Sequence, residues 1–443
     1  MKKNFFFETL PCSIIILMPV LLISGPFLSD LGVVIVTIIF LINSKKNNLK
    51  KYYDNYYFKF FFIFWVILIL SSLFSDNALI SLKNSLFYFR FGIFSLCFWY
   101  LLDKNLLSIK HLFISVLICF SSLIVDGYIQ YIFGKNIFGY ELYNDYRVSS
   151  FFGSELILGS YIARFFPILF GLFIFLDNQK RNKLLLFIIT IIFILSEGLI
   201  LLSGERLALL FMNLSAVYLI LMLREYKTYR LWTYIVSIGL IIVMLNLFPN
   251  AKERLIDKTY YDITRNKIEN KTTTNKIYIF SKPHTDMYVS AYRIFLDNKL
   301  FGVGPRQFRN TCGFFPLDEK NKYGKHEIFK YKVSAYSCET HPHNTYIELL
   351  SEAGIFAFLI VAGLFILIFY FSIKHFVFKF IRGKKGIIND FEICLFSAIL
   401  ISLWPFSPSG SFFNNWMSIV YYFPIGLLLW QRSKSKDLTK QGK

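Results

Sequence analysis

A short polar stretch carries the residues best suited to chemistry. It reads His-Pro-His-Asn from His341 to Asn344, with His343 third, and the carboxylates Glu348 and Glu352 follow four residues apart. Residues four apart share one face of a helix. An imidazole has an ordinary pKa of about 6.5, so it can accept a proton from a hydroxyl group at neutral pH. The stretch therefore predicts a general base, His343, with His341, Asn344 and Glu348 binding the substrate around it.

Arg206 ends the sequence Ser-Gly-Glu-Arg at a turn between two apolar runs. A guanidinium at the mouth of a membrane bundle is costly to bury without a partner. The adjacent Glu205 is a poor partner, because helical neighbours one residue apart point in different directions. We therefore favour an anionic ligand and predict a catalytic role for Arg206. Phosphate fits, since the planar guanidinium can bond two of its oxygens together.

Two further arginines, Arg147 and Arg293, could bind phosphate in the same way as Arg206. Arg147 lies in a turn-rich loop, where a surface salt bridge with Glu141 or Asp145 is its simplest alternative role. Arg293 falls within residues 286–298, where apolar residues recur as in an amphipathic helix on a membrane surface. With the groups above, these arginines would hold a phosphorylated carrier, Arg293 in a catalytic role and Arg147 in a binding role.

Other chemistries of the polar stretch stay open. Cys338 and the two histidines could bind zinc, but Cys312 offers Cys338 a disulfide partner in the same outward segment. Helix capping would explain His343 and Asn344 without catalysis. The sequence holds no Asp-x-Asp motif for a metal-bound nucleotide sugar and no motif of a nucleophilic Ser or Cys enzyme. We predict the disulfide, no metal and no cofactor.

Composition places these residues in a membrane protein. The 443-residue chain is 55% hydrophobic and 19% aromatic, and its mean hydropathy is +0.51, outside the range of soluble domains. A bilayer core needs about 20 helical residues per span. We therefore expect an all-α polytopic bundle of about twelve spans. The expected spans are residues 8–28, 31–42, 58–74, 80–102, 111–133, 156–176, 184–202, 205–223, 231–248, 344–372, 391–405 and 415–430.

The net charge of +20 follows the expected topology. Alternate loops, among them 43–59 and the tail 431–443, hold 25 Lys and Arg, whereas the short loops between them hold four. This positive-inside pattern indicates cytoplasmic termini and argues against nucleic-acid binding. Lys2 and Lys3 precede an apolar run without a small-residue cleavage site, so we expect that run to stay as an anchor.

This topology divides the chain into four parts. Spans one to nine occupy residues 1–248, a partly helical periplasmic loop occupies 249–343, spans ten to twelve occupy 344–430, and the basic tail follows. As one helix capped by Asn344, the tenth span would be about 43 Å long and project beyond the hydrocarbon. Arg90 lies inside the fourth span, where an ionisable group faces a cavity, a partner or the interface.

These residues resemble the O-antigen ligase and polymerase superfamily, integral membrane proteins that move glycans off undecaprenyl diphosphate on the periplasmic face. The ligase branch carries His, then Asn, Ser or Gln, nine residues, and Gly. Here His343, Asn344 and Gly354 match, while Ala357 stands where the family has its next glycine. Three further elements are similar: Ser203-Gly204-x-Arg206, Arg293 before Gly302 and Gly304, and Arg147 before Gly153 and Gly159. The matches run from about residue 126 to 360.

The resemblance implies an inverting glycosyltransferase of the bacterial inner membrane that needs neither metal nor nucleotide. His343 would activate the acceptor hydroxyl, while Arg206 and Arg293 would hold the diphosphate and stabilise the leaving group. In the ligase branch the donor is an undecaprenyl diphosphate-linked O-antigen chain, and the acceptor is the lipid A core of lipopolysaccharide.

Alternatives remain within and outside that superfamily. A polymerase would lengthen the glycan, of an O-antigen or exopolysaccharide, on its lipid carrier, and a protein O-oligosaccharyltransferase would move it onto Ser or Thr. No residue pattern separates these acceptors. A flippase or transporter is the alternative of another class. Transporters place charged or helix-breaking sites near mid-membrane, whereas the ionisable groups here gather at one rim, which favours chemistry at a surface.

Overall fold

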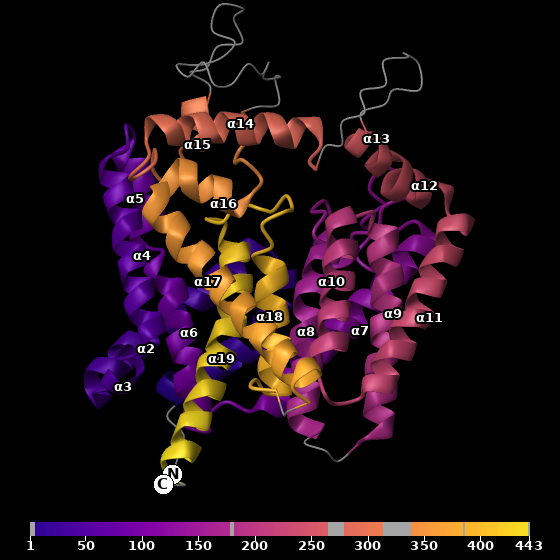
Figure 1. The fold of residues 1–443 in the computed structure, drawn as a ribbon, viewed down its shortest axis with the longest axis horizontal. Coiled ribbons are helices and arrows are strands. Elements are labelled where there is room, and N and C mark those ends of the chain that lie inside the picture. Colours follow the sequence, from indigo (N-terminus) through magenta and orange to yellow (C-terminus); the bar gives the residue numbers. More distant parts are fainter. Residues whose placement is uncertain (1–4, 178–180, 265–278, 313–337, 384–385, 442–443) are drawn as a thin grey trace, which may run out of the picture.

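The computed structural model describes residues 5–177, 181–264, 279–312, 338–383 and 386–441, with side chains up to residue 434. Helices make up the regular structure of these residues, and two isolated β-bridges, Lys135 with Glu141 and Tyr143 with Arg147, are the exceptions. Figure 1 shows long helices standing side by side, with shorter ones across one end. The expected all-α polytopic bundle is confirmed.

Nine helical stretches of the described chain are long and apolar enough to cross a membrane. They are Phe5–Ile23 (η1 and α1), Pro26–Asn47 (α2), Tyr56–Leu73 (α4), Ala78–Asp103 (α5, Ala78–Leu86, and α6, Phe89–Asp103), Ile109–Phe133 (α7), Leu158–Asp177 (α8), Lys183–Ser203 (α9), Lys227–Leu247 (α11) and Thr345–Ile381. The other three expected spans are also helices: α10 (Arg206–Met222), α18 (Asp390–Ser402) and α19 (Asn415–Gln441). The second span, expected to be short, is 22 residues long.

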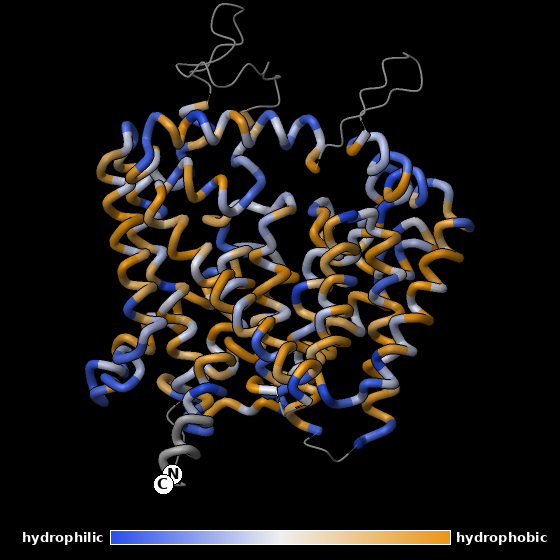
Figure 2. Tube along the Cα trace, in the orientation of Figure 1, coloured by the Kyte–Doolittle hydropathy of each residue, from blue (hydrophilic) through white to orange (hydrophobic). Residues whose placement is uncertain are grey.

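Hydropathy along the chain explains how the helices are arranged. Apolar residues fill the middle of the bundle and hydrophilic ones gather at both ends (Figure 2). In the most apolar 18-residue stretch of α8, 89% of the residues are buried inside the protein. In the corresponding stretch of α11, only 17% are buried. Burial of α8 by its neighbours makes it a central helix. The apolar surface of α11 is left for lipid, because lipid tails solvate it as well as protein does.

Arg90 has its partners inside the bundle. It lies near the start of α6, and its guanidinium pairs with Asp30 at 2.8 Å and donates to the Asn415 side chain at 3.1 Å. These contacts tie α2 and α19 to α6. A charge within a span is tolerated when it is paired in this way, so we assign Arg90 to the scaffold.

The segment between α11 and the tenth expected span contains several short helices. They are α12 (Pro249–Lys252), η3 (Glu253–Asp257), α13 (Lys258–Thr264), α14 (Lys282–Asp297) and α15 (Phe308–Thr311). The expected amphipathic helix is α14, which starts four residues earlier than predicted and buries Met287, Ala291 and Ile294. Figure 1 shows α14 lying across one end of the bundle, while α19 runs to the opposite end.

The tenth expected span is broken, and this corrects the prediction of one straight helix. After α16 (Thr345–Glu348) and a π-turn, η7 (Leu349–Ala353), the chain bends at Gly354 before α17 (Gly354–Phe376). Gly354 has φ +77°, and a Cβ there would collide with the backbone of Leu300. Only glycine adopts this conformation without strain. The break keeps residues 343–353 at the end of the bundle that α14 covers.

Candidate functional site

His343 is held in an unusual backbone conformation. Its φ is +52°, a region that few non-glycine residues occupy. The His343 carbonyl accepts hydrogen bonds from the Ser409 amide at 2.8 Å and the Tyr288 hydroxyl at 3.3 Å. Strain of this kind persists only where the surroundings fix the residue. Contacts from α14 and from the loop before α19 provide that fixation.

Three histidine rings meet at this point. The ring centroids of His341 and His343 are 3.9 Å apart, and His284, two residues into α14, lies 5.8 Å from His343. His284 was missed in the sequence, because nothing in its own segment indicates a neighbour some sixty residues away. An imidazole donates through one nitrogen and accepts through the other, so the cluster brings several donors and acceptors together.

All three histidines have pKa values below the ordinary one. Burial lowers the pKa of His343; burial and then the positive charge of His343 lower the pKa of His341 to about 3. The pKa of His284 falls to about 4 through burial, His343 and Arg206, in that order. The rings are therefore uncharged at neutral pH. An uncharged, oriented His343 can accept a proton, as the predicted general base must.

The positive charge of Arg206 acts on the histidine cluster, because it is one of the influences that lower the pKa of His284. Its guanidinium donates to the Asp262 carboxylate at 2.8 Å and to the Thr259 hydroxyl at 3.2 Å. The sequence interpretation favoured an anionic ligand as the partner of Arg206, whereas in the structure α13 supplies a carboxylate partner, Asp262; binding of an anionic ligand stays a prediction. As predicted, Glu205 is not that partner: it accepts from the amides of Gly159 and Ser160 instead.

Asn344 and the residues after it hold His343 in place. The Asn344 side chain accepts from the Tyr346 and Ile347 amides, which confirms the predicted N-cap. Its amide group also donates to the carbonyls of Pro405 and Ser407, at 2.9 and 3.2 Å. These bonds fix the loop before α19 against α16. The structure thus gives Asn344 a positioning role, and its predicted contact with substrate stays a prediction.

Glu348 and Glu352 are both buried, and each holds a different loop. Glu348 accepts from the Ser411 hydroxyl at 2.5 Å and the Phe412 amide at 2.8 Å, in the same loop that contacts Asn344. Glu352 accepts from the amides of Arg306 and Phe308, at 2.7 and 2.8 Å. Carboxylates that accept backbone hydrogen bonds act as rigid anchors. Both therefore position η7 and its neighbours, and substrate binding by Glu348 stays a prediction.

Arg293 lies nine residues after His284 on α14. At about 100° and 1.5 Å per residue, this is roughly 13.5 Å along the axis and about half a turn around it. The two side chains therefore leave opposite flanks of α14. Arg293 is buried, 2% exposed, and burial lowers its pKa. The structure brings His284 next to His343 and lets the charge of Arg206 act on His284. The convergence of the arginines on His343 and the catalytic role of Arg293 stay predictions.

Arg147 takes neither of the salt-bridge partners considered from the sequence. Glu141 pairs with Lys135 at 2.9 Å, and the Arg147 Nε donates to the Ser203 carbonyl at 2.7 Å. Arg147 is 5% exposed, so it is part of the interior beside the Ser-Gly-Glu-Arg turn. Arg147 thus contacts the turn that also contains Arg206. Its binding role stays a prediction.

Cys312 and Cys338 are neighbours in the structure. Both are thiols in the structure, and the pKa of Cys312 is raised first by its hydrogen bond with Cys338 and then by burial. The predicted disulfide is not formed here, although the sulfur atoms are close enough to interact; it stays a prediction. Within the described ranges, no group of three His, Cys, Asp or Glu is arranged to hold a metal ion.

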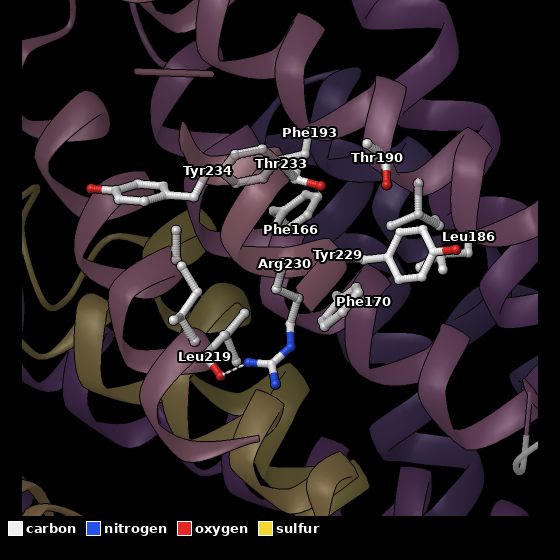
Figure 3. A pocket seen from close by; sticks show the side chains of 13 residues that line it. Phe166, Phe170, Leu186, Thr190, Phe193, Leu219, Tyr229, Arg230, Thr233 and Tyr234 are labelled. Carbon is white, nitrogen blue, oxygen red and sulfur yellow. Dashed lines mark hydrogen bonds between the residues drawn. The ribbon is translucent and has the colours of Figure 1, made fainter. Parts of the chain in front are cut away.

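A separate apolar cavity of about 50 Å³ lies among α8, α9, α10 and α11 (Figure 3). Phe166, Phe170 and Tyr229 are among the residues around it, and Arg230 donates to the Leu219 and Leu223 carbonyls. Leu219 is thirteen residues, or about 20 Å of helix, from Arg206. This cavity is therefore not the histidine site.

Comparison with known proteins agrees with this description. None of the curated proteins matches the chain. Residues 190–362 match the family model described as O-antigen ligase, a range that begins in α9 and ends in α17. Arg206, His284 and His343 all fall inside it. This match covers 173 of the 443 residues and supports a relationship with the O-antigen ligase superfamily, which suggests a glycosyltransferase-like enzyme acting on lipid-linked glycans.

Proposed function

We propose that this protein is a ligase-type glycosyltransferase. It would move a glycan from undecaprenyl diphosphate onto a hydroxyl group of a lipid A core acceptor. The observation that carries the proposal is the buried, positioned His343, with its pKa lowered, next to His284, on which the charge of Arg206 acts. Glycosyl transfer from a diphosphate requires a base that accepts the proton of the acceptor hydroxyl and a cation that stabilises the leaving diphosphate.

In the proposed reaction, His343 accepts the proton of the acceptor hydroxyl. The acceptor oxygen bonds to the anomeric carbon while the bond from that carbon to the diphosphate oxygen breaks, which inverts the configuration. The diphosphate leaves with the bonding electrons. Arg206 stabilises the negative charge on that leaving group. His284 orients His343 or the diphosphate from α14, and Arg293 is the further diphosphate ligand that the family resemblance suggests.

We place this site on the periplasmic face of the inner membrane. The basic loops gather at the end opposite α14, as the positive-inside rule requires of cytoplasmic loops. A lipid-linked diphosphate presents its charge near the membrane surface, where α14 lies. Both termini would then be cytoplasmic.

The spacing from His343 and Asn344 to Gly354 resembles that of the ligase branch and is our reason for proposing a ligase, although it does not identify the acceptor. A polymerase or a protein O-oligosaccharyltransferase would use the same base and cation with another acceptor. A transporter is disfavoured, because α14, which carries His284 and contacts His343, lies across one end of the bundle rather than near its middle.

A reconstituted assay tests the proposal. The purified full-length protein in liposomes receives one undecaprenyl diphosphate-linked glycan and, in separate reactions, a lipid A core, a second lipid-linked glycan or a Ser/Thr peptide. We expect glycan on the lipid A core without any transmembrane gradient. Transfer only to the second glycan or to the peptide would replace the ligase reaction by that alternative. No transfer to any acceptor would contradict glycosyl transfer itself.

A further inference from the structure

The loop between α18 and α19 forms one wall of the histidine site. The Ser409 amide donates to the His343 carbonyl at 2.8 Å. Earlier in the loop, the carbonyls of Pro405 and Ser407 both accept from the Asn344 amide group, at 2.9 and 3.2 Å. The loop is therefore fixed both to His343 and to the residue that follows it.

Phe406 lies between these two anchored carbonyls and is exposed. Its side chain is 66% exposed, whereas in the described stretch from Ile388 to Trp430 every other large apolar side chain is buried or half-buried. The packing of the two helices accounts for that burial, because α18 packs against α8 and α10, and α19 packs against α2 and α6. Phe406 is thus an uncovered aromatic ring at the end of the bundle that carries His343.

Neighbouring residues hold Phe406 in place. The Trp404 ring packs edge-on against it, with ring centroids 6.4 Å apart and an angle of 71° between the rings. Trp404 packs in turn against Phe365 of α17. Prolines at 405 and 408 fix the backbone dihedral φ next to Phe406. An aromatic ring that is already ordered loses little conformational entropy when a ligand covers it.

A sugar ring fits the chemistry of this surface. The C–H bonds on one face of a pyranose ring carry partial positive charge, and the face of an aromatic ring carries partial negative charge, so the two faces attract each other. Ser407, Ser409 and Gly410 surround Phe406 in sequence. These small, mostly polar residues suit a ligand with hydroxyl groups better than a hydrocarbon tail, which could not hydrogen-bond to them.

We propose that Phe406 is a stacking platform for one sugar ring of a glycan substrate. The choice of ligand rests on the glycosyl transfer proposed above. Both the acceptor glycan and the donor glycan offer such a ring face, and binding experiments can separate the two. Phe406 takes no part in proton transfer. It sets which sugar can lie beside His343.

Glycan binding without transfer tests the platform directly. The full-length protein in detergent is mixed with core oligosaccharide released from lipopolysaccharide in one sample, and with the released O-chain in another. Saturation transferred from the protein to the glycan protons is measured by NMR. Wild type should saturate the C–H protons of one sugar in at least one sample, and that sample identifies the glycan that stacks. Phe406→Leu stays apolar but loses the aromatic face, so the signal should fall about fivefold, whereas Phe406→Trp should keep it.

Kinetics in the liposome assay provide the second readout. For the glycan that stacks on the platform, Phe406→Leu should raise KM about fivefold and change kcat less, because binding is weakened while the base stays in place. Phe187→Leu is the matched control, since Phe187 is 61% exposed near the start of α9 and sixteen residues before Ser203. It should behave like wild type in both readouts.

The outcomes separate the platform from the transfer reaction. Gel filtration and unfolding temperatures are compared first, so that only folded variants are scored. Unchanged saturation and KM in Phe406→Leu, or an equal loss in Phe187→Leu, would overturn the platform and leave the transfer reaction standing. Glycan binding that depends on Phe406 in a protein without transfer activity would keep the platform and overturn the transfer reaction.

Discussion

His343 differs from a surface histidine in its backbone and in its charge. The positive φ directs the residue away from the path of a helix, and burial keeps its ring neutral. Neither property is visible in the sequence, where His343 could equally be a helix-capping residue. The cluster with His284 and His341 explains why a base would be placed here: each ring disfavours a positive charge on the others.

The first prediction concerns the pH dependence of transfer. Because the pKa of His343 lies below its ordinary value, the base form persists at pH 6.5 and is lost only as the pH falls further. The acid limb of the rate against pH should therefore have its midpoint below about 6.5. Initial rates in the liposome assay provide the measurement. A midpoint at or above that value would show that His343 is not the neutral base.

The second prediction concerns acid stability. His284 and His341 have folded-state pKa values of about 4 and about 3, below the unfolded value of about 6.5. The unfolded state therefore binds more protons below pH 6.5, and the unfolding temperature should fall as the pH is lowered from 6.5 towards 4. His341→Asn should lose less stability over this interval. An equal loss in wild type and variant would contradict the burial of a neutral His341.

At the scale of elements, the site depends on contacts between segments that are distant in sequence. Asn344 and Glu348 connect α16 to the loop before α19, and Glu352 connects η7 to the residues around Phe308. The break at Gly354 makes this arrangement possible, because a straight helix would carry the polar stretch away from α14.

The third prediction tests the N-cap of α16. Asn344→Ala removes a cap and two loop contacts, so it should lower the free energy of unfolding by about 1 to 2 kcal/mol and also reduce transfer. Asn182→Ala is the control, because Asn182 caps α9 through the Leu185 amide near the other end. It should lower stability alone. Thermal unfolding and initial rates would be measured together. Equal transfer in the two variants would argue against positioning by Asn344.

The helices were largely predictable, whereas the partners of the site residues were not. Apolar runs of span length and an asparagine before Thr345 depend on local sequence, and both predictions held. Asp262 pairs with Arg206 across 56 residues, and Asp30 pairs with Arg90 across 60. Such pairs arise from packing of whole helices, so no local pattern indicates them. His284 was missed for the same reason.

At the scale of the whole molecule, the apolar middle and polar ends describe a protein built for a bilayer (Figure 2). Residues 190–362 resemble the O-antigen ligase family, which implies lipid-linked substrates, and α14, which carries His284, lies across one end of the bundle. Lipid-borne substrates could reach this end by diffusing in the membrane plane. The two ends of the bundle must then face different compartments.

The fourth prediction tests that orientation. In a variant with all six cysteines replaced by serine, Leu300→Cys places a thiol at an exposed position near α14, and Lys104→Cys places one in the loop after α6. A membrane-impermeant maleimide added to intact cells with a permeabilised outer membrane should label position 300 and not 104. Labelling of position 104 alone would reverse the topology.

The most direct test of the central claim is the single-turnover rate of glycan transfer by His343→Ala. General-base catalysis contributes about 100-fold or more, so this rate should fall at least that far, and Arg206→Ala should lose a similar factor. His111→Ala, at the start of α7 and away from the cluster, should keep the wild-type rate. A folded His343→Ala protein that transfers glycan at the wild-type rate would contradict the role of His343 as the base.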